Sequence, residues 1–231
     1  MTETVLVIAA HPDDEVLGCG GTIARHASEG DIVHILIMTT GEASRSDFSE
    51  ERVAARTDSA RAAADILGAT PPRIMDFPDN RMDTVALLDI IKAVEEVISE
   101  IRPRVVYTHH GGDLNVDHRI THQAVVTACR PQPECVVKEI YTFETPSSTE
   151  WSSKGCGPDF TPALFTDISS FLEKKKQALD CYPSEIRDFP HARSHEAIEA
   201  LARRRGCTVG LEAAEAFGVV RQIRPLPGSP A

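Results

Sequence analysis

Four ionisable side chains fall within five positions near the start of the chain, in the segment AAHPDDE at residues 9–15. Adjacent carboxylates repel one another unless a cation or a cluster of hydrogen-bond donors neutralises them. His11 and Asp14 offer an imidazole nitrogen and a carboxylate oxygen on one short turn, a ligand pair that suits a divalent metal. Asp13 would lie beside that metal without serving as a ligand, so we predict that it acts as a base on metal-bound water.

An ordinary strand-to-helix turn is the alternative interpretation of this segment. In that case Asp13 or Asp14 caps the following helix, and Glu15 complements the helix dipole. Capping explains one carboxylate but leaves the combination of histidine, proline and two aspartates without a reason. The residue types therefore favour metal chemistry.

A second polar segment, HHGGDLNVDH at residues 109–118, follows a predicted strand at 105–108. Loops at the carboxyl ends of parallel strands meet in one crevice, so this segment faces residues 9–15 if the first and fourth strands are neighbours. A catalytic zinc site needs a third protein ligand and one open position. Asp117 is a candidate helix N-cap whose carboxylate could also orient a neighbouring ring. Spacing alone leaves four candidates for the third ligand: His109, His110, His118 and His122.

The elements that must position these residues alternate along the chain. Apolar runs predict strands, and amphipathic or alanine-rich segments predict helices of about ten to eighteen residues. This order predicts an α/β fold, a Rossmann-like three-layer sandwich with a mostly parallel central sheet. We expect a single domain over residues 1–231 with an irregular loop at about 145–162. The predicted strands are 4–8, 32–39, 73–77, 105–108, 139–144, 163–168 and 216–223, and the predicted helices are 17–29, 51–67, 84–101, 117–129, 169–179 and 192–205.

Composition excludes several classes of function. The formal net charge of −11 argues against a general binder of nucleic acid or anionic membranes, because phosphate contacts need clustered lysine and arginine. The apolar runs are too short to cross a bilayer, and the N-terminus does not look like a signal peptide. The six cysteines are scattered, which is typical of reduced thiols. We therefore expect a soluble, cytoplasmic protein that binds neither nucleic acid nor membrane. Composition does not decide whether the chain forms a homo-oligomer.

The pairing of AHPDDE after the first strand with Asp117-His118 after a later strand resembles the PIG-L/LmbE-like de-N-acetylase family. The resemblance extends to a helix that ends in Ile66-Leu67-Gly68 and to the tail at residues 210–217. It implies a Rossmann-like fold and zinc-dependent removal of acetyl groups from N-acetylglucosamine-type sugars. Gly18-x-Gly20-Gly21 is only a weak match to a dinucleotide-binding motif, because it lies too far beyond the first strand.

Carried over to this chain, the resemblance makes His11, Asp14 and His118 the ligands of Zn²⁺, or of another divalent metal such as Fe²⁺. It makes Asp13 the general base and Asp117 the carboxylate before the third ligand. Many members have a histidine three positions before that ligand.

Asn115 replaces this histidine here. An amide can donate a hydrogen bond to an oxyanion, but it cannot transfer a proton near neutral pH. Either Asp13 serves as both base and acid, or one of three other rings replaces the missing histidine: His109, His110 or His191.

Substrate contacts are predicted from residues near the strand ends. Asn80 and Arg81 directly follow a strand, and Arg56 lies on a helix that could border the crevice or face solvent. His191 is a weaker candidate, for a lid. Arg45, Arg52 and Trp151 could also border the crevice. The predicted partner is a small N-acetylated sugar, such as a nucleotide sugar or a glycan precursor.

Two alternatives belong to other classes of protein. Two histidines and one carboxylate also form the iron site of non-haem Fe(II) oxygenases. Those enzymes are usually all-β, and Asp13 would have no role in them. A non-catalytic metal-binding protein would hold the same ion without releasing acetate from any N-acetyl sugar.

Overall fold

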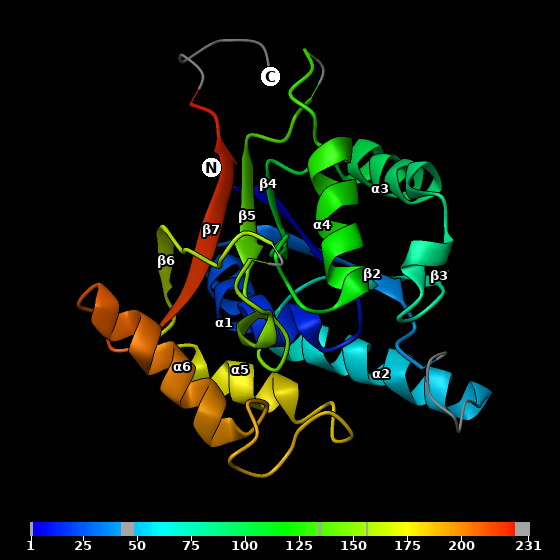
Figure 1. The fold of residues 1–231 in the computed structure, drawn as a ribbon. Coiled ribbons are helices and arrows are strands. Elements are labelled where there is room, and N and C mark those ends of the chain that lie inside the picture. Colours follow the sequence, from blue (N-terminus) through cyan, green and yellow to red (C-terminus); the bar gives the residue numbers. More distant parts are fainter. Residues whose placement is uncertain (1, 43–48, 134, 156, 225–231) are drawn as a thin grey trace.

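The computed structural model describes residues 2–42, 49–133, 135–155 and 157–224. Seven strands form one sheet in the order β3-β2-β1-β4-β5-β7-β6, with helices on both faces (Figure 1). The first five strands pair in parallel, whereas β7 is antiparallel to both β5 and β6. The strands are β1 Thr4–Ala9, β2 Ile32–Thr39, β3 Arg73–Phe77, β4 Val105–His109, β5 Glu139–Phe143, β6 Leu164–Asp167 and β7 Ala214–Gln222.

The helices divide into two layers because successive side chains of a buried strand point to opposite faces. Val5 and Val7 of β1 belong to a core with residues of α1, α2, α5 and α6. Leu6 and Ile8 belong to a second core with residues of α3 and α4. The predicted three-layer α/β architecture is therefore confirmed. The helices are α1 Asp14–Ser28, α2 Glu50–Leu67, α3 Leu87–Ile101, α4 Val116–Ala128, α5 Leu172–Leu179 and α6 His195–Thr208.

Four predicted helix starts were wrong by three residues, and two of them are those of the helices predicted from residues 169 and 192, which begin at Leu172 and His195. Helix α1 begins at Asp14 instead of residue 17, because the chain turns within the polar segment and Asp13 is the N-cap. The helix predicted from residue 84 begins at Leu87. A short 3-10 turn, Met82–Thr84, precedes it, and the extended backbone of Val85 separates the two.

Strands β1 and β4 are neighbours, as the sequence predicted. They pair in parallel from Val5 with Val105 to Ile8 with Thr108. Because both strands end at the same edge of the sheet, the turn at residues 10–15 lies beside the loop at 110–115. The fold therefore brings together the two segments that carry the candidate chemistry.

Two further expectations concern thiols and membranes. The cysteines that the structure describes, at positions 19, 129, 135, 181 and 207, are all free. Within the described ranges, no helix has the length and apolar character needed to span a bilayer.

Candidate metal centre and active site

Three donor atoms converge at the end of β1. Asp14 Oδ2 lies 3.1 Å from His11 Nδ1 and 3.2 Å from His118 Nε2. The two ring nitrogens are 3.3 Å apart. A tetrahedral zinc with bonds of about 2.0–2.1 Å holds its ligand atoms about 3.3–3.4 Å from one another. The three predicted ligands, called the donor cluster below, therefore have the spacing of a tetrahedral metal site.

A carboxylate orients each ring of the donor cluster from its other side. His11 Nε2 lies 3.1 Å from Asp117 Oδ2, and His118 Nδ1 lies 3.0 Å from Asp113 Oδ1. Metal-binding histidines usually donate their second N–H to a carboxylate in this way. The two hydrogen bonds leave His11 Nδ1 and His118 Nε2 directed at Asp14.

Burial and charge decide the protonation of the donor cluster. Burial lowers the pKa of His11, but the carboxylates of Asp117 and Asp14 outweigh it and raise the pKa to about 10. Burial raises the pKa of Asp14, but the charge of His118 and the hydrogen bond from His11 hold it well below its usual range. The negative charges gathered around the two rings are what a divalent cation in the donor cluster would neutralise in place of a proton.

One oxygen of Asp14 tests whether this site suits a metal. Among the described residues, the buried Oδ1 atom of Asp14 has no hydrogen-bond partner. An unsatisfied buried carboxylate oxygen costs at least about 1–3 kcal/mol unless a ligand occupies its coordination position. A hard oxygen and two imidazole nitrogens are also ligands that zinc accepts. The donor set therefore suits a divalent metal, and Oδ1, which is not one of the three clustered atoms, gives Asp14 a second oxygen that could bind the ion.

His109 is a neutral ring that supports the donor cluster. Its Nε2 accepts the N–H of Ala10 at 2.8 Å, so the proton lies on Nδ1, 3.2 Å from the hydroxyl of Thr145. Burial lowers the pKa of His109 well below its usual value. The ring stacks on His118 at 3.9 Å between centroids. His109 is therefore unsuited to donate a proton to a substrate.

The other three candidate histidines, His110, His122 and His191, also bond or pack against other groups. His110 Nε2 lies 2.8 Å from the carbonyl oxygen of Pro158. His122 Nδ1 bonds the carbonyl oxygen of His109 at 2.9 Å. The ring of His191 packs edge-on against Trp151 at 5.9 Å between centroids.

A polar pocket of about 190 Å³ opens beside the donor cluster. Within the described part of the chain, its lining includes His11, Asp13 and His118 but none of His109, His110 and His191. The remaining wall is formed by side chains from several loops, among them Arg56, Asn80, Asn115, Ser147 and Arg193. This lining suits a ligand rich in hydroxyl, amide or charged groups.

Asn115 is the N-cap of α4. Its Oδ1 accepts the N–H of Asp117 at 2.8 Å, and its Nδ2 donates to Asn80 Oδ1 at 2.9 Å. The suggestion that Asp117 caps this helix was therefore wrong. The carboxylate of Asp117 instead accepts the N–H groups of Asn80, at 2.6 Å, and Met82, at 3.0 Å. These bonds fix the carboxylate that orients His11.

The predicted substrate arginines separate into buried and exposed groups. Arg56 is buried, pairs with Glu185 and donates to the carbonyl of Pro12 at 3.0 Å. It lines the pocket, so the alternative of a solvated helix face was wrong for Arg56.

Arg81 is exposed and lies outside the pocket lining. Its N–H bonds the carbonyl of Pro78 at 3.1 Å, which closes a turn that leaves the side chain in solvent. Arg52 Nε donates to Glu42 at 2.8 Å. Arg45 lies outside the described residues.

Sequence reasoning missed Arg193 and Asp113. Arg193 Nη1 donates to Asp13 Oδ2 at 2.7 Å, from a segment without helical or strand periodicity. Burial raises the pKa of Asp13 to about 6, with Arg193 opposing and Asp14 adding to this shift. The only sequence signal for Asp113 was its place in the polar loop after β4.

Comparisons with known proteins agree with this geometry. The family model described as PIG-L, GlcNAc-PI de-N-acetylase, matches residues 6–129. The uncharacterized deacetylase YaiS of Escherichia coli K12 is 34% identical, over 71% of this chain and 81% of that protein. A 1D-myo-inositol 2-acetamido-2-deoxy-alpha-D-glucopyranoside deacetylase of Rhodococcus jostii RHA1 is 28% identical, over 86% of this chain and 87% of that protein.

A solved structure carries a different activity. GalB, the 4-carboxy-2-hydroxymuconate hydratase of Pseudomonas putida KT2440, superposes with a TM-score of 0.78 at 26% identity. The match covers 97% of this chain and 100% of GalB. The family match, the likeness to YaiS and the shared fold lead to one conclusion. This chain belongs to the PIG-L family.

Proposed function

We propose that this chain is a metal-dependent hydrolase that removes the acetyl group from an N-acetylated amino sugar. The observation that carries the proposal is the donor cluster, whose three atoms lie 3.1–3.3 Å apart beside Asp13 and a polar pocket. The similarity to YaiS and to the Rhodococcus enzyme, both named deacetylases, supports it. A nucleotide sugar or a glycan precursor is the substrate class that we favour.

In this proposal His11, Asp14 and His118 hold the metal, and Asp113 and Asp117 keep the two rings in place. Zinc is the ion we favour, and Fe²⁺ is compatible with the same donors. When bound, such an ion supplies Lewis acidity and lowers the pKa of water toward neutrality.

Asp13 moves the protons of the reaction. It accepts a proton from water as the water oxygen bonds to the acetyl carbon, and it returns a proton to the nitrogen as the carbon–nitrogen bond breaks. Acetate and a free amine are the products. Asp13 takes both roles because Asn115 cannot transfer a proton, and none of the three alternative histidines lines the described pocket.

The pocket residues would bind and orient the sugar. Asn80 and Asn115 offer amide groups to hydroxyls or to the developing oxyanion, and Arg56 closes the wall behind Asp13. Arg81 and His191 would reach only parts of the substrate that extend beyond the pocket.

Hydration of a carbon–carbon double bond is the second candidate function. The likeness to GalB favours it, because this likeness extends over nearly the whole chain at 26% identity. Asp13 would accept a proton from water as the water oxygen bonds to one carbon of the double bond, and it would return a proton to the other carbon, so no acetate would form.

One experiment separates these functions. The purified protein is incubated with N-acetylated sugars and nucleotide sugars, with and without a chelator, and acetate and free amine are measured. Equal amounts of both, abolished by the chelator and by Asp13→Asn, are expected. A parallel assay follows the absorbance of an unsaturated hydroxy-carboxylate. Absorbance loss without acetate would establish the hydratase instead, and oxygen consumption with a 2-oxo acid would establish an oxygenase.

A further inference from the structure

We propose that Asp13 is clamped at two points, with Tyr182 acting through Glu15 on its backbone and Arg193 acting on its side chain. Tyr182 and Arg193 are then positioning residues for the reaction. The inference rests on the role proposed above for Asp13 as the proton-transfer group. It assigns a purpose to two side chains that come from the C-terminal third of the chain.

The backbone of Asp13 needs an external restraint. Its φ of 117° lies in a region that residues with side chains rarely adopt. Such a conformation persists only where the surrounding structure imposes it, and it is concentrated at functional sites. The non-helical φ of Asp13 directs its side chain into the pocket while Asp14 begins helix α1.

Glu15 and Tyr182 supply the backbone restraint. Glu15 Oε2 accepts the N–H of Asp13 at 3.0 Å, and Glu15 Oε1 accepts the hydroxyl of Tyr182 at 2.5 Å. All three side chains are buried, so water does not compete for these bonds. Tyr182 follows helix α5 and thus ties the turn after β1 to a distant part of the chain.

Arg193 supplies the side-chain restraint. Its Nη1 donates to Asp13 Oδ2 at 2.7 Å, and its Nε donates to Ser147 Oγ at 2.7 Å. Nη1 also lies 3.2 Å from Glu185 Oε2. A guanidinium is planar, so bonds at two of its nitrogens fix its orientation.

The segment around Arg193 is itself held in place. The N–H of Arg193 donates to His191 Nδ1 at 3.1 Å. The next residue, Ser194, caps helix α6 by accepting the N–H of Ala197 at 3.1 Å. Arg193 therefore donates its hydrogen bond to Asp13 Oδ2 from a segment that is itself held by hydrogen bonds. Asp13 Oδ1, which accepts no hydrogen bond from the described residues, is the oxygen that exchanges protons.

The test compares Tyr182→Phe and Arg193→Gln with two matched controls. Tyr107→Phe removes another buried hydroxyl, which bonds His26, and Arg205→Gln breaks an ion pair with Glu144. We expect kcat to fall about 10-fold for Tyr182→Phe, the effect of one lost hydrogen bond. We expect a fall of about 100-fold for Arg193→Gln, because a small displacement of a reacting group has that effect. KM of Tyr182→Phe and the metal content of both variants should stay unchanged, as should kcat of both controls.

Rescue separates positioning from folding. Arg193→Lys, which keeps the charge but loses the planar fork, should have a kcat between those of the wild type and Arg193→Gln. Millimolar guanidinium should restore part of the activity of Arg193→Ala. Two results would contradict this proposal. One is a kcat of Tyr182→Phe and Arg193→Gln equal to that of the controls. The other is a change in KM or metal content without a change in kcat.

A second readout does not need turnover. Crystal structures of Tyr182→Phe and Arg193→Gln should show the Asp13 carboxylate displaced or in several positions, with the donor cluster unchanged. An Asp13 that keeps its position in both variants would overturn the clamp. Absence of acetate release by the wild-type protein would instead count against the proposed function alone.

Discussion

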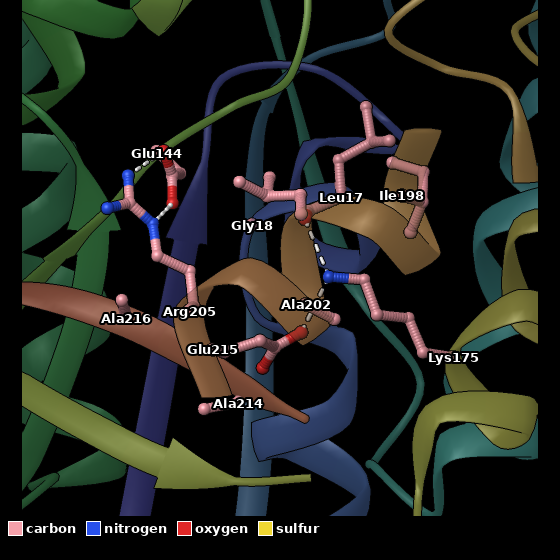
Figure 2. A pocket seen from close by; sticks show the side chains of 11 residues that line it. Leu17, Gly18, Glu144, Lys175, Ile198, Ala202, Arg205, Ala214, Glu215 and Ala216 are labelled. Carbon is pink, nitrogen blue, oxygen red and sulfur yellow. Dashed lines mark hydrogen bonds and ion pairs between the residues drawn. The ribbon is translucent and has the colours of Figure 1, made fainter. Parts of the chain in front are cut away.

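Two buried charge clusters lie along helix α1, and they differ in whether their polar atoms are satisfied. The first is the donor cluster at the start of the helix. The second is the ion pair of Lys175 and Glu215, beside the middle of α1 (Figure 2). Lys175 Nζ donates to Glu215 Oε1 at 2.6 Å and to the carbonyl of Leu17 at 2.9 Å.

The ion pair is complete and enclosed. Helix α1 departs from helical geometry at Cys19, which leaves backbone N–H groups without helical partners. Glu215 accepts two of them, from Gly21 at 3.0 Å and from Thr22 at 2.7 Å. The adjoining cavity is only about 20 Å³, room for about one water molecule.

The donor cluster is incomplete and open. Asp14 Oδ1 has no hydrogen-bond partner among the described residues, and the neighbouring pocket measures about 190 Å³. Buried polar groups are normally satisfied, so an exception beside a pocket indicates a place for a ligand. The comparison shows that the satisfied ion pair contributes to holding α1 in place, whereas the donor cluster keeps an unsatisfied oxygen where the proposed ligand would bind.

The largest effect is expected from removing one member of the donor cluster. His118→Ala should lose the bound metal and lower kcat at least about 10³-fold, because the Lewis acid is worth several kcal/mol of transition-state stabilisation. Metal content and acetate release measure this. His34→Ala, which removes a ring bonded to Thr70, is the control. If His118→Ala kept its full metal content and activity, the donor cluster would not be the metal site that distinguishes it from the ion pair.

A large loss of stability, with little loss of chemistry, is expected from breaking the ion pair. Lys175→Met leaves Glu215 charged and buried without its cation, which should lower the free energy of unfolding by about 3–5 kcal/mol. Urea denaturation measures the change. The double variant Lys175→Met/Glu215→Gln should recover much of the loss. If the single variant were as stable as the wild type, the ion pair would not be what holds α1.

A smaller, pH-dependent effect is expected at Asp113, a satisfied carboxylate that serves the donor cluster. Burial raises its pKa, but His118 and the hydroxyls of Ser148 and Thr149 outweigh this and hold the pKa well below its usual range. Ionised Asp113 therefore stabilises the fold above its unfolded pKa of about 4. That contribution disappears as the pH falls through the lower folded pKa.

Asp113→Asn should accordingly lower the free energy of unfolding by about 1–3 kcal/mol at pH 7. The difference in the free energy of unfolding between Asp113→Asn and the wild type should become smaller below about pH 4. Urea denaturation at pH 7, 5 and 3.5 measures it, with Asp58→Asn, an exposed partner of Arg61, as the control. An equal difference at all three pH values would mean that the charge of Asp113 does not contribute.

The sequence predicted the central features of the fold and of the donor cluster. Strands β1 and β4 are buried, so apolar runs mark them at Val5–Ala9 and Val105–Tyr107, and the chemistry that follows these runs stands out against them. The turn at His11 to Asp14 is local, so its chemistry could be inferred from spacing alone.

Contacts over long separations could not be predicted in this way. Arg193 reaches Asp13 across 180 positions, and Tyr182 reaches Glu15 across 167. No periodicity marks these residues, because they lie in turns between helices α5 and α6.

The sequence by itself determined which chemical groups this protein brings to its site: an imidazole and adjacent carboxylates on a short turn, and histidines after a second strand. Spacing left four histidines open and the family resemblance selected His118, but only the tertiary structure brings that ring next to His11 and Asp14. The pairing of β1 with β4 and the start of α4 at its Asn115 cap direct His118 toward Asp14, while His109 and His122 are held by backbone groups. The reason is geometric, because distances between side chains far apart in sequence depend on strand order and helix direction, which no local spacing contains.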